Sequence, residues 1–274
     1  MNRPRKRFGQ HWLNSDKVLD QIVAAAQLQP TYRILEIGAG TGILTRRLLP
    51  EVSAVIAVEI DRDLCKKLVK KFGDIDNFLL LQGDFINLDI PNLLKDFPKF
   101  QNPNKVVANI PYNITGLILE KVLGSITQPA ITNYESIVLL IQKEVGERLV
   151  AVPSTKAYGA LSVKIQYLAN CELICDVPAK SFYPPPKVDS VVVKLYPRTI
   201  DKPVKNIKQL ETLIKLGFAN KRKMLRNNLK SLIDLDQLND LLEKLNINSQ
   251  ARAENLSLDD WINLSNHFQD YKLS

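Results

Sequence analysis

Residues 35–42 read Leu35-Glu36-Ile37-Gly38-Ala39-Gly40-Thr41-Gly42, and they decide the fold class. The apolar run before Gly38 predicts a strand that leads into a glycine-rich turn, from which a helix starts. Glycine allows the tight turn and the close approach of the backbone to a ligand. The dinucleotide pattern G-x-G-x-x-G would need glycine at position 43, which is Ile43 here, whereas G-x-G-x-G is complete. The turn therefore predicts a ligand site at the end of this strand and disfavours NAD.

Strand-like and helix-like segments alternate on either side of this turn. Ser15 is placed to cap a preceding helix and Pro30 to end it. Continuous runs of Val, Ile and Leu are typical of a parallel sheet covered on both faces by helices, so the predicted fold class is α/β. Two later alternating segments, 172–177 and 188–196, predict an antiparallel hairpin at the sheet edge. The other expected strands are 54–58, 78–81, 106–108 and 137–141, and the expected helices are 61–72, 115–126, 143–150 and 160–168.

The composition is that of an ordinary globular protein with a basic surplus. Of 274 residues, 37 are Lys or Arg and 29 are Asp or Glu, so the formal net charge of +8 indicates a polyanionic partner. Residues 198–208 are polar, and those that follow place apolar side chains at helical spacing. We therefore expect a larger domain at 1–197 and a small helical domain at 198–274.

No segment predicts membrane insertion or export. The longest purely apolar run, 137–141, is far too short to span a bilayer, and no long apolar signal segment follows the basic N-terminus. We expect an unprocessed, cytoplasmic protein. The three cysteines are Cys65, Cys171 and Cys175, and no histidine lies near them in the sequence. We therefore expect no zinc site and no other metal site.

Acidic residues follow the next two strands. Val58-Glu59-Ile60-Asp61 ends the second strand, about 20 residues after the glycine turn, where an acidic side chain reaches a ribose diol. We assign Glu59 to the ribose and Asp61 to the cap of the following helix. Asp84 follows the third strand. It could act only as a turn former, but its place at the carboxyl edge of the sheet favours ligand binding.

The fourth strand ends in Asn109-Ile110-Pro111-Tyr112, which predicts a more specific chemistry. The Asn109 side-chain oxygen and a carbonyl held by Pro111 can accept two hydrogen bonds from an exocyclic amine, and Tyr112 offers a ring that stacks on a base. A turn with proline at its second position is the alternative, but it leaves the aromatic residue unexplained. The tetrapeptide therefore predicts a site for an amino group on a planar ring.

These four signals, in this order, resemble the class I S-adenosylmethionine-dependent methyltransferases, in which Asn-Ile-Pro-Tyr is similar to the tetrapeptide of enzymes that methylate amino groups on planar systems. Further segments resemble the KsgA (RsmA) family of small-subunit ribosomal RNA adenine dimethyltransferases: residues 5–13, 158–163, 182–190, 218–223 and 225–229. The sequences of residues 5–13 and 182–190 occur in far fewer families than a glycine turn does. The resemblance implies a Rossmann-like methyltransferase sheet with a small C-terminal helical domain.

The resemblance also implies the site residues. The cofactor would be S-adenosylmethionine, with Asp84 at its adenine and Glu59 at its ribose. Many relatives carry Asn-Phe where this chain has His11-Trp12, and a histidine can still donate or accept a hydrogen bond. Phe182 would stack on the target adenine opposite Tyr112, although it could instead be an apolar anchor of the edge hairpin. The implied cofactor-binding residues are His11, Leu13, Gly38, Glu59, Asp84 and Asn109, and the implied catalytic residues are Asn109, Pro111, Tyr112 and Phe182.

The implied activity is dimethylation of the N6 amino groups of two adjacent adenosines near the 3′ end of 16S rRNA. The partners would be small-subunit rRNA and the immature small ribosomal subunit, with no membrane, and the enzyme is expected to be a monomer. Two alternatives stay open. One is a 23S rRNA adenine N6-methyltransferase of the macrolide-resistance type, and the other is a non-catalytic ribosome assembly factor.

Two basic blocks are candidates for RNA contact. A charge run is more often a solvated face, but beside an adenine-type site on a basic chain it favours phosphate contacts. One block is the N-terminal run Arg3, Arg5, Lys6 and Arg7. The other lies in a stretch that is free of acidic residues and that we expect to be helical: Lys221, Arg222, Lys223 and Arg226.

Overall fold

The computed structural model describes residues 5, 9–130, 134–198 and 204–268. The chain divides into two compact units. The first contains Met1–Gly124, Ala130–Gly146 and Cys171–Pro197, and the second contains Ser125–Pro129, Glu147–Asn170 and Arg198–Ser274.

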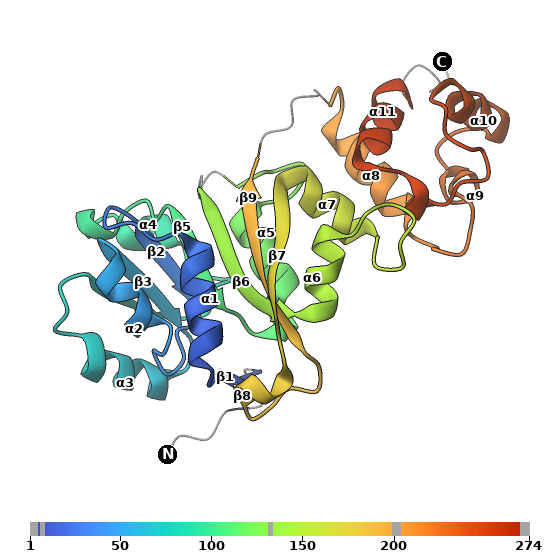
Figure 1. Cartoon of the computed structure of the whole chain (residues 1–274). Helices are drawn as coiled ribbons and strands as arrows, with labels where there is room; N and C mark the ends of the chain where they lie inside the picture. The colour runs from blue at the N-terminus through green and yellow to red at the C-terminus, as the bar shows by residue number, and fades with distance from the viewer. Residues whose placement is uncertain (1–4, 6–8, 131–133, 199–203, 269–274) are drawn as a thin grey trace. The chain divides into compact units, whose positions relative to one another are not determined.

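The first unit contains a seven-stranded sheet with the strand order β4-β3-β2-β5-β6-β9-β7 (Figure 1). The five strands β4, β3, β2, β5 and β6 pair in parallel with their neighbours, and β9 pairs with β6 in the antiparallel direction. The predicted α/β class is therefore confirmed, and the late pair of strands lies at one end of the sheet as expected. The strands are β2 (Arg33–Ile37), β3 (Ala54–Glu59), β4 (Phe78–Gln82), β5 (Lys105–Asn109), β6 (Ser136–Gln142), β7 (Ala169–Val177) and β9 (Ser190–Pro197).

Helix α1 (Asp16–Ala26) lies against β5, β6 and β9 (Figure 1). Ser15 caps it as predicted, and it ends at Ala26, before Pro30, because Gln27 adopts a left-handed conformation with φ of 48°. Its Leu19 and Ile22 are fully buried in one apolar cluster with residues of the sheet. The other helices before residue 160 are α2 (Thr45–Leu48), α3 (Arg62–Phe72), α4 (Ile90–Leu94), α5 (Thr115–Leu123) and α6 (Lys143–Val150).

Two differences from the expected elements have local causes. Helix α5 ends at Leu123 rather than at residue 126, because Gly124 takes a φ of 80° that leaves the helical region. A second, two-stranded sheet was not expected: β1 (Trp12–Leu13) pairs with β8 (Phe182–Tyr183). This pairing joins the N-terminal segment to the loop that precedes β9.

The second unit is helical. Its apolar cluster combines Tyr158 and Val163 with residues of the four C-terminal helices, including Trp261. Gly217 is required where it stands, because a Cβ there would lie 2.4 Å from Cη2 of Trp261. The helices are α7 (Ala160–Leu168), α8 (Ile207–Gly217), α9 (Leu225–Leu229), α10 (Leu235–Lys244) and α11 (Leu258–Phe268).

The compact units differ from the expected domains in one respect. The division after Pro197 coincides with the expected boundary at 197/198, but residues 125–129 and 147–170 pack in the second unit rather than in the first. The reason is burial, since Tyr158 and Val163 complete the core of the C-terminal helices.

Candidate functional site

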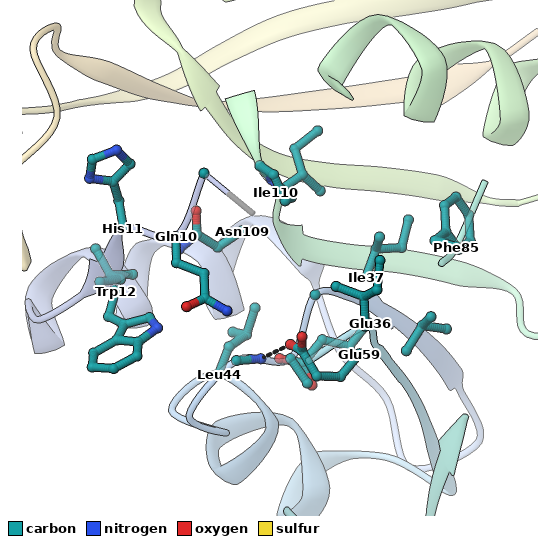
Figure 2. A pocket seen from close by; sticks show the side chains of 18 of the residues that line it. Gln10, His11, Trp12, Glu36, Ile37, Leu44, Glu59, Phe85, Asn109 and Ile110 are labelled. Carbon is teal, nitrogen blue, oxygen red and sulfur yellow. Dashed lines mark hydrogen bonds between the residues drawn. The ribbon is translucent and has the colours of Figure 1, made fainter. Parts of the chain in front are cut away.

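The first unit contains a cavity of about 270 Å³ at the carboxyl ends of the parallel strands (Figure 2). Its walls come from the N-terminal segment, the glycine turn after β2 and the ends of β3, β4 and β5. Every residue expected to bind the cofactor lines it, as do three of the four expected catalytic residues: His11, Leu13, Gly38, Glu59, Asp84, Asn109, Pro111 and Tyr112. Parallel strands bring their carboxyl ends to one edge, which is why residues far apart in sequence meet here.

The glycine turn has the backbone that its sequence predicts. Gly38, Gly40 and Gly42 have φ values of 74°, 59° and 76°, in the left-handed region that favours glycine. Gly42 is also constrained by packing, because a Cβ there would lie 2.5 Å from Cε2 of Phe72 in α3. The turn therefore packs closely against α3.

Glu59 and Asp61, at the end of β3, have different hydrogen-bond partners. Glu59 is buried, and its carboxylate accepts hydrogen bonds from the backbone N–H groups of Gly40 at 2.7 Å and Asp61 at 2.8 Å. Burial raises the pKa of Glu59, while these two hydrogen bonds oppose the shift. Asp61 caps α3 by accepting from Asp63 N–H at 3.0 Å, so its predicted cap is confirmed.

Asp84 lies in the turn after β4. Its carboxylate accepts hydrogen bonds from the Ile86 backbone N–H at 3.0 Å and from the Asn87 side chain at 2.8 Å. Phe85, which the sequence analysis did not single out, is buried beside it and also lines the cavity. These bonds hold Asp84 in place, and its side chain is only partly buried.

Asn109 stands at the end of β5 with its side chain on the cavity wall, as Figure 2 shows. Its side-chain amide makes no hydrogen bond within the described part of the chain. Pro111 has an extended backbone and starts the turn that carries Tyr112. Burial raises the pKa of the Tyr112 phenol, and its hydroxyl lies 2.5 Å from Oγ of Ser190 in β9. The site thus presents an amide free to accept a hydrogen bond next to a fixed aromatic ring.

His11 and Leu13 enter the cavity from the N-terminal segment. The His11 ring lies nearly parallel to that of Tyr112, with centroids 5.8 Å apart and an interplanar angle of 19°. Its Nδ1 is 2.7 Å from the carbonyl oxygen of Pro184, which can only accept, so Nδ1 carries the proton. Leu13 is buried in β1, opposite Phe182 of β8.

Glu36 is a cavity residue to which the sequence analysis gave no role. Only 1% of it is exposed, and its carboxylate accepts a hydrogen bond from Oγ1 of Thr45 at 2.6 Å. Burial raises the pKa of Glu36 to about 8, and the nearby charge of Glu59 acts in the same direction. An acidic residue between apolar neighbours, in Ile34-Leu35-Glu36-Ile37, was the sequence signal that could have identified it.

The charge of the cavity is one-sided. Three carboxyl groups line it, those of Glu36, Glu59 and Asp84, and its lining includes no Lys or Arg among the residues that the structure describes. The raised pKa of Glu36 keeps that group protonated near pH 7, so the negative charge comes from Glu59 and Asp84. This charge favours a ligand that carries positive charge and disfavours a phosphate group. This agrees with the glycine pattern, which disfavoured NAD.

Phe182 does not have the expected surroundings. It is 4% exposed, belongs to the apolar cluster that contains Leu13 and Val18, and is not part of the cavity lining. A base cannot stack on a ring whose faces are packed against the core. In this structure Phe182 is therefore the apolar anchor that was its alternative role, and the expectation of an exposed stacking ring is corrected.

Three of the four candidate RNA-binding residues in the second unit lie in a turn, not in a helix. Lys221, Arg222 and Lys223 are exposed in the connection between α8 and α9, and only Arg226 is on α9. The expectation of one helical stretch is therefore wrong. The cause is Asn228, whose side chain donates to the carbonyl oxygens of Gly217 and Asn220 and so holds the turn closed.

The N-terminal block is described only at Arg5, because Arg3, Lys6 and Arg7 lie outside the described residues. Arg5 pairs with Asp61 at 3.2 Å and also with Asp63. Its charge is therefore already matched by two carboxylates beside the cavity, which disfavours the expected phosphate contact for this residue.

Three further findings concern the described residues. They contain no group of three or more His, Cys, Asp or Glu side chains that could hold a metal ion. Cys65, Cys171 and Cys175 are free thiols. In the same ranges, no helix is long and apolar enough to cross a membrane.

Comparison with known proteins shows the family of this chain. The family described as ribosomal RNA adenine dimethylase matches residues 1–270. The chain belongs to this family. Among curated relatives of this dimethylase, one from a Nostoc species is 64% identical over 266 residues, covering 97% of this chain and 98% of the relative, and is named ribosomal RNA small subunit methyltransferase A. A relative from a Picosynechococcus species with the same name is 63% identical, covering 98% of each chain.

Solved structures agree with this family membership. A dimethyladenosine transferase from Plasmodium falciparum is 30% identical, with a TM-score of 0.79, and covers 95% of this chain and 98% of its own. The 23S rRNA methyltransferase ErmE is 26% identical, with a TM-score of 0.71, and covers 96% of this chain and all of its own. The predicted methyltransferase sheet is confirmed by both, and the dimethylase fold extends over nearly the whole chain.

Proposed function

We propose that this dimethylase transfers methyl groups from S-adenosylmethionine to the N6 amino groups of two adjacent adenosines near the 3′ end of 16S rRNA. The observation that carries the proposal is the meeting of Asn109 and Tyr112 with Glu59 and Asp84 in one cavity. It puts groups suited to an aromatic amine beside groups suited to a nucleoside. The names of the curated relatives, at above 60% identity, support the small-subunit rRNA as the substrate.

The residues present fit S-adenosylmethionine. Its sulfonium and ammonium groups are positive, and the described residues that line the cavity include Glu59 and Asp84 but no Lys or Arg. Glu59 would bind the ribose and Asp84 the amino group of the cofactor adenine. Gly38, His11 and Leu13 would complete the pocket, with Asn109 at the border between cofactor and substrate. The cofactor, when bound, supplies an electrophilic methyl group.

Catalysis consists of holding the target amine. The Asn109 oxygen and the Ile110 carbonyl, which precedes Pro111, would each accept one N–H of adenine N6, while Tyr112 stacks on the base. Held in this way, the nitrogen lone pair would face the methyl group that the bound cofactor supplies, in line for transfer, and the N–H proton released from the amine would pass to water. Positioning alone can supply much of the rate gain for such an in-line transfer.

The adenine must leave its stack in the RNA to reach this cavity, at a cost of a few kcal/mol that stacking on Tyr112 would offset. The exposed turn with Lys221, Arg222 and Lys223 would contact RNA phosphates, and Arg226 lies beside it. We propose an immature small ribosomal subunit as the physiological substrate, a monomeric enzyme, and the cytoplasm as its location.

Mass spectrometry of rRNA tests the proposal. The purified chain would be incubated with S-adenosylmethionine and ribosomal subunits from a strain that lacks the enzyme, and dimethyladenosine would be mapped in each rRNA. We expect two adjacent dimethyladenosines near the 3′ end of the small-subunit rRNA. Modification of the large-subunit rRNA alone would overturn the proposal in favour of the macrolide-resistance type. No modification, with assembly still restored in vivo, would favour a non-catalytic assembly factor.

A further inference from the structure

The hydroxyl of Tyr112 is held by a residue from a distant strand. Oγ of Ser190 lies 2.5 Å from the Tyr112 oxygen, and Ser190 is fully buried as the first residue of β9. Its backbone is fixed in turn, because Ser190 pairs with Gln142 of β6, a strand inside the sheet. The hydrogen bond therefore connects the stacking ring to the rigid sheet rather than to a loop.

This bond restricts the plane of the ring. A tyrosine ring is attached to the backbone at one end, and a hydrogen bond at its hydroxyl fixes the other end. The nearly parallel ring of His11 lies beside it and is itself held by the carbonyl of Pro184. Without Ser190, the Tyr112 ring would keep its attachment to the chain and its contact with His11 but lose the fixed point at its tip.

The second methyl transfer depends more on this plane than the first. Adenine N6 starts with two N–H groups, which Asn109 and the Ile110 carbonyl can both accept, whereas monomethylated N6 has only one. Stacking must then supply more of the positioning that two hydrogen bonds supplied before. A ring that is free to tilt should therefore impair dimethylation more than monomethylation.

We propose that Ser190 is a positioning residue that sets the plane of Tyr112 and thereby supports the second methyl transfer. The inference rests on the proposed function, because it assumes adenine N6 as the acceptor. It adds a residue of β9 to the machinery, since Ser190 does not line the cavity and acts only through Tyr112.

The test compares the first and second transfer rates under single-turnover conditions, with mono- and dimethyladenosine in small-subunit rRNA measured by mass spectrometry. Ser190→Ala and Tyr112→Phe each remove the same hydrogen bond. We expect each to slow the second transfer by about tenfold, as for one lost hydrogen bond, and the first transfer by less. The double variant should be no slower than either single variant, because both lose one shared interaction.

Ser136→Ala is the matched control. Ser136 is a buried serine of β6 whose hydroxyl has no hydrogen-bond partner among the described residues. This variant should keep both rates. Equal slowing of both transfers by Ser190→Ala, or additive losses in the double variant, would show a merely structural role and overturn the proposal.

A second measurement does not depend on activity. Crystal structures of the wild type and of Ser190→Ala compare the direction of the Tyr112 ring, which should be tilted or spread over several directions in the variant. A Tyr112 ring that superimposes on the wild-type ring would overturn the proposal. Failure of the proposed function is distinguishable, because it would show as a wild-type chain that forms no dimethyladenosine in small-subunit rRNA.

Discussion

The Glu59 carboxylate accepts a hydrogen bond from the backbone N–H of Gly40 at 2.7 Å, which ties the end of β3 to the glycine turn after β2. The same carboxylate also accepts from the N–H of Asp61. One buried side chain therefore shapes the turn while it lines the cavity. These two hydrogen bonds hold the glycine turn against the end of β3.

Glu59→Gln should weaken S-adenosylmethionine binding by about 10- to 100-fold, the effect of losing a hydrogen bond to a charged group. Isothermal titration calorimetry measures this affinity directly. Glu120→Gln is the control, since Glu120 is exposed on α5 away from the cavity lining. Equal affinities for Glu59→Gln and the wild type would contradict the ribose assignment.

Asn109→Ala should leave cofactor affinity nearly unchanged and lower the methylation rate by orders of magnitude. The reason is that its amide oxygen would accept from the target amine in the transition state. Asn92→Ala, at an exposed position of α4, is the control. If turnover of Asn109→Ala matches the wild type, the assignment of the amine-binding oxygen is wrong.

Replacing Lys221, Arg222 and Lys223 by Ala should weaken RNA binding and flatten its salt dependence. Each lost phosphate contact should reduce the slope of log K against log salt by roughly one unit. Cofactor affinity should not change. The control removes three charges at Lys205, Lys208 and Lys215, which are exposed in and before α8. An equal change of slope in both triple variants would point to net charge instead of a specific contact.

The stability of the free chain should decrease as the pH rises from about 5 to 8. Burial raises the pKa of Glu36 from 4.5 to about 8, so the folded state keeps a proton that the unfolded chain releases. The contribution is complete below pH 4.5 and is lost as the pH rises towards 8. Urea unfolding of Glu36→Gln should show a smaller decrease, with Glu120→Gln as control. An identical pH profile in Glu36→Gln would refute the buried neutral carboxyl.

Gly42→Ala should lower the free energy of unfolding by about 1–3 kcal/mol, because the added Cβ combines a left-handed φ with a clash. That Cβ would lie 2.5 Å from Cε2 of Phe72 and 2.9 Å from Cδ2 of Leu68. Gly116→Ala is the control, since a Cβ there meets nothing within 4 Å. The melting temperatures of the two variants are measured by thermal unfolding. Equal melting temperatures would contradict the packing at Gly42.

The strand ends that form one side of the cavity could be predicted from local sequence. The glycine spacing 38-40-42, the two acidic residues and the tetrapeptide 109–112 each stand at the end of a predicted strand. Parallel strands in one sheet must bring such ends together, so the pattern determined the fold class and brought these residues to one edge, while Glu36 and Phe85 were not singled out. The helices α6 and α7 also begin and end where their periodicity predicted.

Tertiary structure alone decided the features that depend on partners far away in the chain. The pairing of Leu13 with Phe182 buried a ring that the sequence analysis expected to be open to a base. The contact of Tyr112 with Ser190 joins residues 78 positions apart. Neither contact has a periodicity that a sequence reveals, because two-residue strands and single hydroxyl groups carry no pattern. Residues that pack together through space, such as Tyr158 with the C-terminal helices, likewise set the limits of the compact units.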